Sequence, residues 1–319
     1  MIDAEIEQYA RRLGAQREDV KRLLANAARS ADGARIAKSV LRAKLRGNGK
    51  NPDDDDPFNA VLSPDSLGGS GVVFGPLAAG GGELVWRHDE IPYSGLFVGA
   101  PGFGKTSQII NLVVRLSPPY PVLIPDLRGD YEPLVRLIPG ARFFVFGSFP
   151  INLLRCSSRV PPPVWNQKFS EVFTDQFDLF QASRRYLNLM LDSLEARRVE
   201  SGHWPCLLDL RDALEDRKEQ RGSDELGFRN RCLARVDAIC RALGEKAVGV
   251  EQGINLEALV EAGAMVIFRI DLEKGLQDFL VNWLLAYAFQ HRASTEDKFH
   301  QKPLIFVLDE QRSILRIRK

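Results

Sequence analysis

The chain has 319 residues, 45% of them apolar, which is enough for two domains or for one large domain with an insertion. Its formal net charge of +1 indicates no class of partner, and its four cysteines include no CxxC pair. This argues against a small disulfide-rich or zinc-bound domain and favours reduced thiols in a cytoplasmic protein. We expect no signal peptide and no membrane insertion, because no run of about 18 apolar residues occurs.

Residues 1–50 are predicted to form a helical N-terminal segment with a break after Leu13. They carry 12 lysines and arginines against 6 acidic residues, whereas residues 51–100 carry one arginine against 8 acidic residues. This imbalance fits a segment with its own binding task, or simply a solvated helical face. The spacing resembles a helix-turn-helix, but we favour a small helical adaptor, since many helical pairs share the pattern.

Residues 51–66 are predicted to be an acidic linker, because the prolines and four aspartates of NPDDDDPF cannot continue a helix. Beyond it, glycine clusters alternate with GVVF and ELVW over residues 67–86, which is typical of a small β-hairpin. We place this hairpin at the start of the first part of a larger core, residues 67–165.

Strand and helix signals alternate through the rest of this first part, which is typical of a parallel sheet covered by helices on both faces. The predicted strands are residues 95–99, 121–126 and 141–146, and the predicted helices between them are residues 106–116 and 130–138. The pattern predicts an α/β fold.

VPPPVW at 160–165 ends the alternation, and residues 166–250 are charged, helical in pattern and without a strand signal. We therefore predict an all-helical insertion there. The second part of the core, residues 251–319, is predicted to contain a strand at 264–272, a buried helix at 276–292 and a last strand at 302–311.

The stretch GAPGFGKT at 99–106 lies between a predicted strand and a predicted helix and matches the Walker A pattern GxxxxGK[ST]. Its glycines let the loop close around a phosphate chain, while backbone N–H groups and the helix N-terminus attract negative charge. Lys105 is predicted to reach the β and γ oxygens of ATP, and the Thr106 hydroxyl to bind Mg²⁺. The predicted ATP-binding residues are Gly99, Ala100, Pro101, Gly102, Phe103, Gly104, Lys105, Thr106, Ser107 and Asp126.

The apolar run LIFVLDE at 304–310 predicts a buried strand that ends in two acids, as a Walker B strand does. Asp309 is the predicted second Mg²⁺ residue, acting directly or through water. Glu310 is predicted to polarise the attacking water, so that Lys105 and Glu310 are the catalytic candidates. A carboxylate beside the γ-phosphate favours hydrolysis over a static nucleotide switch.

In this order the motifs resemble the FtsK–HerA superfamily of ring-forming, DNA-pumping ATPases and the related ATPases of conjugation and type IV secretion. The resemblance covers about residues 70–311, with PDLRGDYEPLVRLI similar to the family's DxKGEY segment and KPLIFVLDEQ similar to its Walker B strand. It implies a HerA-like P-loop NTPase domain with a RecA-like parallel sheet, an all-helical insertion, and ATP and Mg²⁺ as cofactors.

The chain departs from this family pattern in three places. Gly129-Asp130-Tyr131 replaces GEY, and Asn152 is followed by leucine instead of proline. The chain also stops soon after the Walker B strand, where family members continue through further strands. Missing strands would leave unpaired edges, so we expect a truncated chain, with a complete but degenerate domain as the alternative.

By resemblance, Asp126 and Arg128 lie near the nucleotide or a subunit interface, although a loop salt bridge would equally explain them. The family completes each site with an arginine from the neighbouring subunit. Arg231, Arg235 and Arg269 are candidates for this role. The four histidines show no metal or triad spacing and are interpreted as surface or core residues.

The resemblance implies a cytoplasmic motor that hydrolyses Mg·ATP and moves double-stranded DNA through a homohexameric ring, with a nuclease or a secretion machine as a further partner. One alternative is a soluble secretion or conjugation ATPase. A second alternative is an ATP-binding subunit that is not a motor and recruits a partner or DNA through its N-terminal helices.

Overall fold

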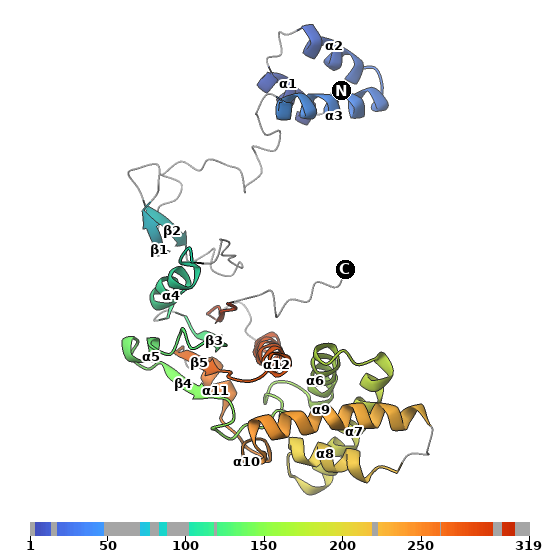
Figure 1. Ribbon diagram of the computed structural model, residues 1–319. Helices are drawn as coiled ribbons and strands as arrows, with labels where there is room; N and C mark the ends of the chain where they lie inside the picture. Colours follow the sequence, from blue (N-terminus) through green and yellow to red (C-terminus); the bar gives the residue numbers. More distant parts are fainter. Residues whose placement is uncertain are drawn as a thin grey trace. The chain divides into compact units, whose positions relative to one another are not determined.

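The computed structural model describes nine stretches of the chain, which are residues 4–13, 18–47, 71–76, 83–87, 102–117, 120–218, 223–261, 263–295 and 302–309. The chain divides into two compact units, one made of Met1–Gly69 and Gly75–Leu84 and the other of Ser70–Phe74 and Val85–Lys319. Figure 1 shows the elements coloured along the sequence. The domain boundaries expected at residues 50, 66, 165 and 250 stay predictions.

The described residues of Met1–Gly69 form three helices: α1 (Ala4–Leu13), α2 (Glu18–Ala27) and α3 (Ala31–Gly47). The helices expected there are therefore confirmed, whereas the break expected after Leu13 lies outside the described residues. Each helix buries one apolar stripe, and Ser30 caps α3 by accepting a 3.0 Å hydrogen bond from the Gly33 N–H. The buried residues are Ile6, Tyr9, Ala10, Leu13, Val20, Ala27, Ala37 and Leu41.

The predicted hairpin is present as a two-stranded sheet of β1 (Gly71–Pro76) and β2 (Glu83–Arg87). Val72 of β1 packs against Leu112, Leu116 and Tyr120, with Trp86 of β2 at the edge of this cluster. Burial of these apolar side chains fixes the β1 strand against the helix that follows the glycine loop.

Among the described residues, the main sheet has four parallel strands in the order β4 (Arg142–Val145), β5 (Met265–Arg269), β3 (Val122–Asp126) and β6 (Ile305–Phe306). The strands expected at 121–126, 141–146 and 264–272 are thus confirmed. The one expected at 95–99 lies outside the described residues. The strand order places β3 and β6, the first and last of these strands along the chain, side by side.

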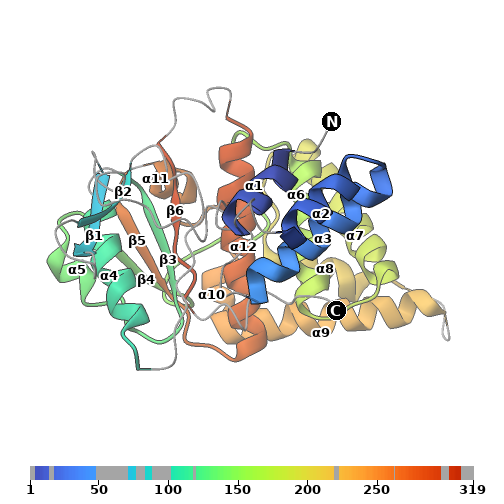
Figure 2. The ribbon, with the colours of Figure 1, turned by 90° about the horizontal axis from the view of Figure 1, so that it is seen from above.

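Both faces of this sheet are covered by helices, as the apolar strand sequences predict. Val122 and Ile124 point to one face, where they meet α4 (Lys105–Leu116) and α5 (Leu134–Leu137). Leu123, between them, points to the other face and joins the core that includes α12 (Lys274–Ala293). Figure 2 shows the strands between α4 and α5 on one side and α12 on the other.

Two predicted elements are shorter than expected. The helix expected over residues 130–138 is the four-residue α5, and the N–H groups of Leu134, Val135 and Arg136 bond carbonyls three residues back, as in a turn. Of the last strand, expected over 302–311, only β6 (Ile305–Phe306) is strand among the described residues. The Val307 N–H still donates a 3.0 Å hydrogen bond to Leu123 O.

The region between β4 and β5 contains α6 (Pro162–Gln176), α7 (Gln181–Ser201), α8 (Leu207–Asp216), α9 (Asp224–Leu243), α10 (Glu245–Val248) and α11 (Leu256–Glu261). The first of these helices, α6, begins at Pro162, within the VPPPVW stretch. Proline suits the first helical turn, where its missing N–H has no helical partner to lose.

α12 packs on α6 through an aromatic seam, which explains why this helix is apolar on most sides. Trp283 of α12 lies edge-on to Trp165 of α6, with ring centroids 6.2 Å apart. The Trp283 indole N–H donates a 3.0 Å hydrogen bond to Leu153 O, so its one polar atom is satisfied. The predicted burial of this helix is confirmed, with Phe289, 66% exposed, as an exception.

Asn152, which is followed by leucine where the family pattern has proline, is buried and connects the segment after β4 to two segments of the helical region through hydrogen bonds. Its amide oxygen accepts from the N–H groups of Leu154 and Arg155 at 2.9 and 3.2 Å. Its amide nitrogen donates to the carbonyls of Pro205 and Glu251, both at 3.0 Å. All the polar atoms of the amide are therefore used in joining three chain segments.

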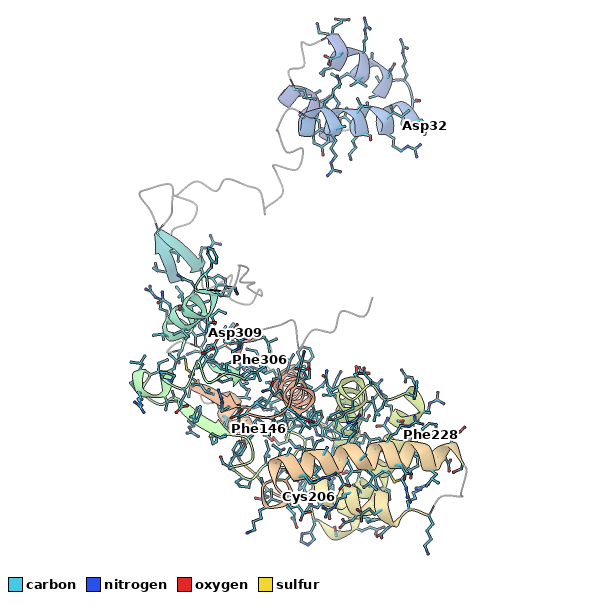
Figure 3. The ribbon with its side chains drawn as sticks, viewed as in Figure 1. Asp32, Phe146, Cys206, Phe228, Phe306 and Asp309 are labelled. Carbon is cyan, nitrogen blue, oxygen red and sulfur yellow. The ribbon has the colours of Figure 1, made fainter. Side chains whose placement is uncertain are left out.

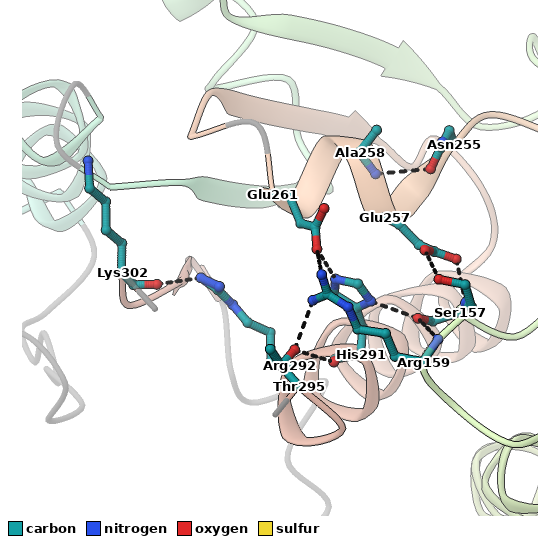
Figure 4. A network of polar contacts seen from close by, with 11 residues as sticks. Ser157, Arg159, Asn255, Glu257, Ala258, Glu261, His291, Arg292, Thr295 and Lys302 are labelled. Carbon is teal, nitrogen blue, oxygen red and sulfur yellow. Dashed lines mark hydrogen bonds and ion pairs between the residues drawn. The ribbon is translucent and has the colours of Figure 1, made fainter. Parts of the chain in front are cut away.

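His291 lies in a buried polar network where α11 and α12 meet the segment after Asn152 (Figure 4). Its Nδ1 is 2.7 Å from Ser157 Oγ, and its Nε2 is 3.2 Å from Glu261 Oε1. Arg159 bonds Glu261 and Thr295 from the same side. With Ser157 2% and His291 1% exposed, the arrangement has no access for a substrate and works as a structural joint.

The network predicts a loss of stability in weak acid. Burial, followed by the charge of Arg159, lowers the pKa of His291, while Glu261 and Glu257 oppose that shift. The unfolded chain therefore takes up a proton near pH 6.5 that the folded chain does not, so stability falls as the pH drops below about 6.5.

We expect the urea midpoint of the wild type to fall between pH 7.5 and 5.5 by more than that of His291→Gln. His203→Gln is the matched control, because His203 is exposed and pairs with Glu251 on the surface. Equal pH dependence in the wild type and His291→Gln would contradict this assignment.

Candidate nucleotide-binding site

The candidate site lies at the carboxyl edge of the main sheet, where parallel α/β sheets bind ligands. Asp126 is the last residue of β3 and Arg269 the last residue of β5. Asp309 follows β6 by three residues, close to the labelled Phe306 in Figure 3. The register pairs Asp126 with Arg269, so strand ends that are far apart in sequence supply side chains to one edge.

The described part of the glycine loop enters α4 through two residues in the left-handed region. Gly102 has φ +82° and Gly104 φ +76°, and a Cβ on either would meet no atom within 4 Å. These glycines are therefore required by backbone conformation, and the space around them is open. Lys105 is the first residue of α4, so its helix N-terminus faces the loop. Gly99, Ala100 and Pro101 lie outside the described residues.

Thr106 and Asp309, the two predicted Mg²⁺ residues, are in direct contact. The Thr106 hydroxyl donates a 3.0 Å hydrogen bond to Asp309 Oδ2 across 203 residues of sequence. Both residues are half-buried. The Walker A and Walker B motifs predict that these two residues lie close together, and the fold brings their side chains into contact.

Tyr131 is a third member of this cluster, to which the sequence reasoning gave no role. Its hydroxyl donates a 3.0 Å hydrogen bond to the same oxygen, Asp309 Oδ2. Tyr131 is 2% exposed and belongs to the core cluster on the α4 face of the sheet. The only sequence signal for it was the tyrosine of the Gly-Asp-Tyr motif.

Asp126 organises the turn that carries Tyr131. Its carboxylate accepts backbone hydrogen bonds from Arg128 at 3.2 Å, Gly129 at 2.7 Å and Tyr131 at 3.3 Å. Asp126 is 1% exposed, and this burial raises its pKa, while the backbone hydrogen bonds and the nearby charge of Arg269 oppose the rise. Asp126 thus shapes the site from its own turn, and the expected contact with a nucleotide stays a prediction.

Arg269 is the only one of the three arginine candidates at this edge. Its Nη1 lies 3.9 Å from Asp126 Oδ1, and its Nη2 lies 3.9 Å from Asp271 Oδ2. Arg231 and Arg235 instead lie on α9, with their guanidinium groups over aromatic rings, Phe180 and Phe228 for Arg231 and Phe177 for Arg235. A role in a neighbouring subunit's site stays a prediction for all three.

Gly129 allows Arg269 to approach this turn closely. Gly129 has φ +89°, and a Cβ placed there would lie 2.3 Å from Arg269 Nη1. Any side chain would therefore have to displace the guanidinium from Asp126 as well as adopt a strained backbone.

We expect Gly129→Ala to lower the free energy of unfolding by more than Gly140→Ala, measured by urea denaturation. Gly140 has a similar φ, +81°, but a Cβ there meets no atom within 4 Å. Backbone strain costs about 1–2 kcal/mol in both variants, and moving the Arg269 guanidinium away from Asp126 adds up to about 1 kcal/mol in Gly129→Ala alone. Equal losses would show that Arg269 gives way freely.

The residues present fit a magnesium nucleotide. A hydroxyl and a carboxylate supply oxygen ligands, which Mg²⁺ prefers, and they stand beside a glycine loop with open space and a helix N-terminus. Glu310, the predicted catalytic base, lies outside the described residues.

The parallel sheet, the covering helices and the loop at its carboxyl edge define an α/β P-loop NTPase fold. Comparison with solved structures agrees: the chain is similar to VirB4 of Thermoanaerobacter pseudethanolicus, with a TM-score of 0.53 and 17% sequence identity. The similarity covers 77% of this chain and 69% of VirB4.

No protein-family model and no curated protein matches the sequence. Among the described residues, no helix is long and apolar enough to cross a membrane.

Proposed function

We propose that the chain is an ATPase that binds Mg·ATP at the carboxyl edge of its main sheet and hydrolyses it. The observation that carries the proposal is the 3.0 Å hydrogen bond from Thr106 to Asp309. It joins the residue after the Walker A lysine to the end of the Walker B strand, which is the arrangement that a magnesium–phosphate site needs.

Each residue has a distinct role in this proposal. The loop through Gly102 and Gly104 would surround the phosphates with backbone N–H groups, and Lys105 would contact the β and γ oxygens. The Thr106 hydroxyl donates a hydrogen bond to Asp309, which leaves the lone pairs of the hydroxyl oxygen for Mg²⁺. Bound Mg²⁺ would supply charge neutralisation at the β- and γ-phosphates. Glu310 would orient the water that attacks the γ-phosphate.

The secretion or conjugation alternative rests on the motif resemblance, and the similarity to VirB4 agrees with it at the level of the fold. A more specific proposal is that the chain pumps double-stranded DNA through a hexameric ring, which rests on the motif resemblance. In such a ring, an arginine from a neighbouring subunit would complete each site.

The test is ATP hydrolysis by the full chain with and without duplex DNA, together with its mass in solution with and without ATP. Mg²⁺-dependent hydrolysis that DNA stimulates, with a hexameric mass, would support the DNA motor. Hydrolysis without DNA stimulation would favour the secretion role. ATP binding by a monomer without hydrolysis would favour the recruiting subunit, in which α1, α2 and α3 would contact the partner or DNA. No ATP binding at all would refute the proposal.

A further inference from the structure

Tyr131 links two acidic residues that come from different strands. Its backbone N–H donates to Asp126 Oδ2 at the end of β3, and its hydroxyl donates to Asp309 Oδ2 beyond β6. The same Asp309 oxygen also accepts from Thr106. One oxygen of Asp309 is therefore held by two hydroxyl donors, one from the glycine-loop side and one from the Asp126 turn.

The phenol of Tyr131 donates its hydrogen bond to Asp309 Oδ2. The ring is packed among Val122, Ile124 and Leu134, and it is 2% exposed. A packed ring on a turn fixed by three backbone hydrogen bonds has little freedom to move its hydroxyl away from Asp309.

We propose that Tyr131 is a positioning residue, whose hydroxyl fixes the orientation of the Asp309 carboxylate relative to Thr106 and so prepares the site for the magnesium ion of the nucleotide. The residue acts through Asp309 and does not itself touch the nucleotide. This inference rests on the proposed function, because it assigns a role within the same site.

A positioning role for Tyr131 accounts for the sequence of the turn. Asp126 accepts hydrogen bonds from the turn, Gly129 makes room for Arg269, and Tyr131 lies in the core with its hydroxyl on Asp309. Partners that orient a metal-binding carboxylate typically change metal affinity by about 10–100-fold when they are removed. The effect should therefore appear in the dependence on Mg²⁺ and not in the affinity for the nucleotide alone.

The experiment compares the wild type with Tyr131→Phe, which removes the hydroxyl and keeps the buried ring. Binding of fluorescently labelled ADP to the full chain is measured in EDTA and over a Mg²⁺ titration. We expect the affinity in EDTA to stay within about 2-fold of the wild type, and the Mg²⁺ concentration for half-maximal binding to rise about 10-fold. Tyr287→Phe is the matched control, because Tyr287 is a buried tyrosine in the α6–α12 seam, and it should change neither value.

A second pair of variants tests the route of the effect. Asp309→Asn and the double variant Asp309→Asn with Tyr131→Phe should require the same Mg²⁺ concentration, because Tyr131 acts only through Asp309. An added effect in the double variant would overturn the inference. So would an unchanged Mg²⁺ requirement in Tyr131→Phe, or an equal loss of ADP affinity with and without Mg²⁺, which indicates a structural role. These outcomes would leave the proposed function intact. A wild type that binds no ADP would contradict both the proposed function and the role of Tyr131.

Discussion

Replacing Lys105 by alanine should lower the affinity for ATP by about 100-fold or more, the largest effect that we expect on binding. Lys105 opens α4 directly after two left-handed glycines, so it stands where the loop and the helix N-terminus converge. A hydrogen bond to a charged group contributes about 1.5–3 kcal/mol, and Lys105 is proposed to contact two phosphates, which gives a loss of this size.

Equilibrium binding of a fluorescent ATP analogue to the purified full chain measures this loss. Lys246→Ala is the matched control, because Lys246 is an exposed lysine of α10. Both variants should keep the thermal stability of the wild type, so that a lost site is separated from a lost fold. Wild-type affinity in Lys105→Ala would show that the loop does not bind the triphosphate.

Replacing Glu310 by glutamine should leave ATP binding within about 2-fold of the wild type and lower the rate of hydrolysis by at least about 100-fold. A positioned general base contributes about 10²–10⁴-fold to a rate, and glutamine keeps the size of the side chain without the carboxylate. The residue follows Asp309, which is held at the sheet edge by Thr106 and Tyr131.

Single-turnover hydrolysis, measured beside equilibrium binding, separates these two effects. Glu200→Gln at the exposed end of α7 makes the same chemical change away from the site and should leave the rate unchanged. A Glu310→Gln variant that hydrolyses ATP at the wild-type rate would assign the base to another residue.

The residues at the sheet edge show how far the sequence alone could go. The predicted pairing of Thr106 with Asp309 relied on two motifs whose spacing to their own strand or helix is local, and the structure brings these side chains together. Tyr131 carried no comparable signal, because its role depends on how β6 lies beside β3. Arg269, the one of the three candidate arginines at this edge, could not be chosen from among them without the β3–β5 register.

The bounds of two helices could not be predicted from local patterns. A helix was expected over residues 130–138, but only Leu134–Leu137 is helical, and the N–H groups of Leu134, Val135 and Arg136 bond carbonyls three residues back. The VPPPVW stretch ends the alternation of strands and helices, and its prolines also begin α6, because the first helical turn tolerates proline.

The class of fold and the phosphate loop follow from local patterns, because glycines at fixed spacing, apolar runs and helical stripes are properties of neighbouring residues. The hydrogen bonds from Thr106 and Tyr131 to one oxygen of Asp309, and the approach of Arg269 to Asp126, required the folded structure. These contacts depend on strand order and register, which are set by packing between segments far apart in the chain.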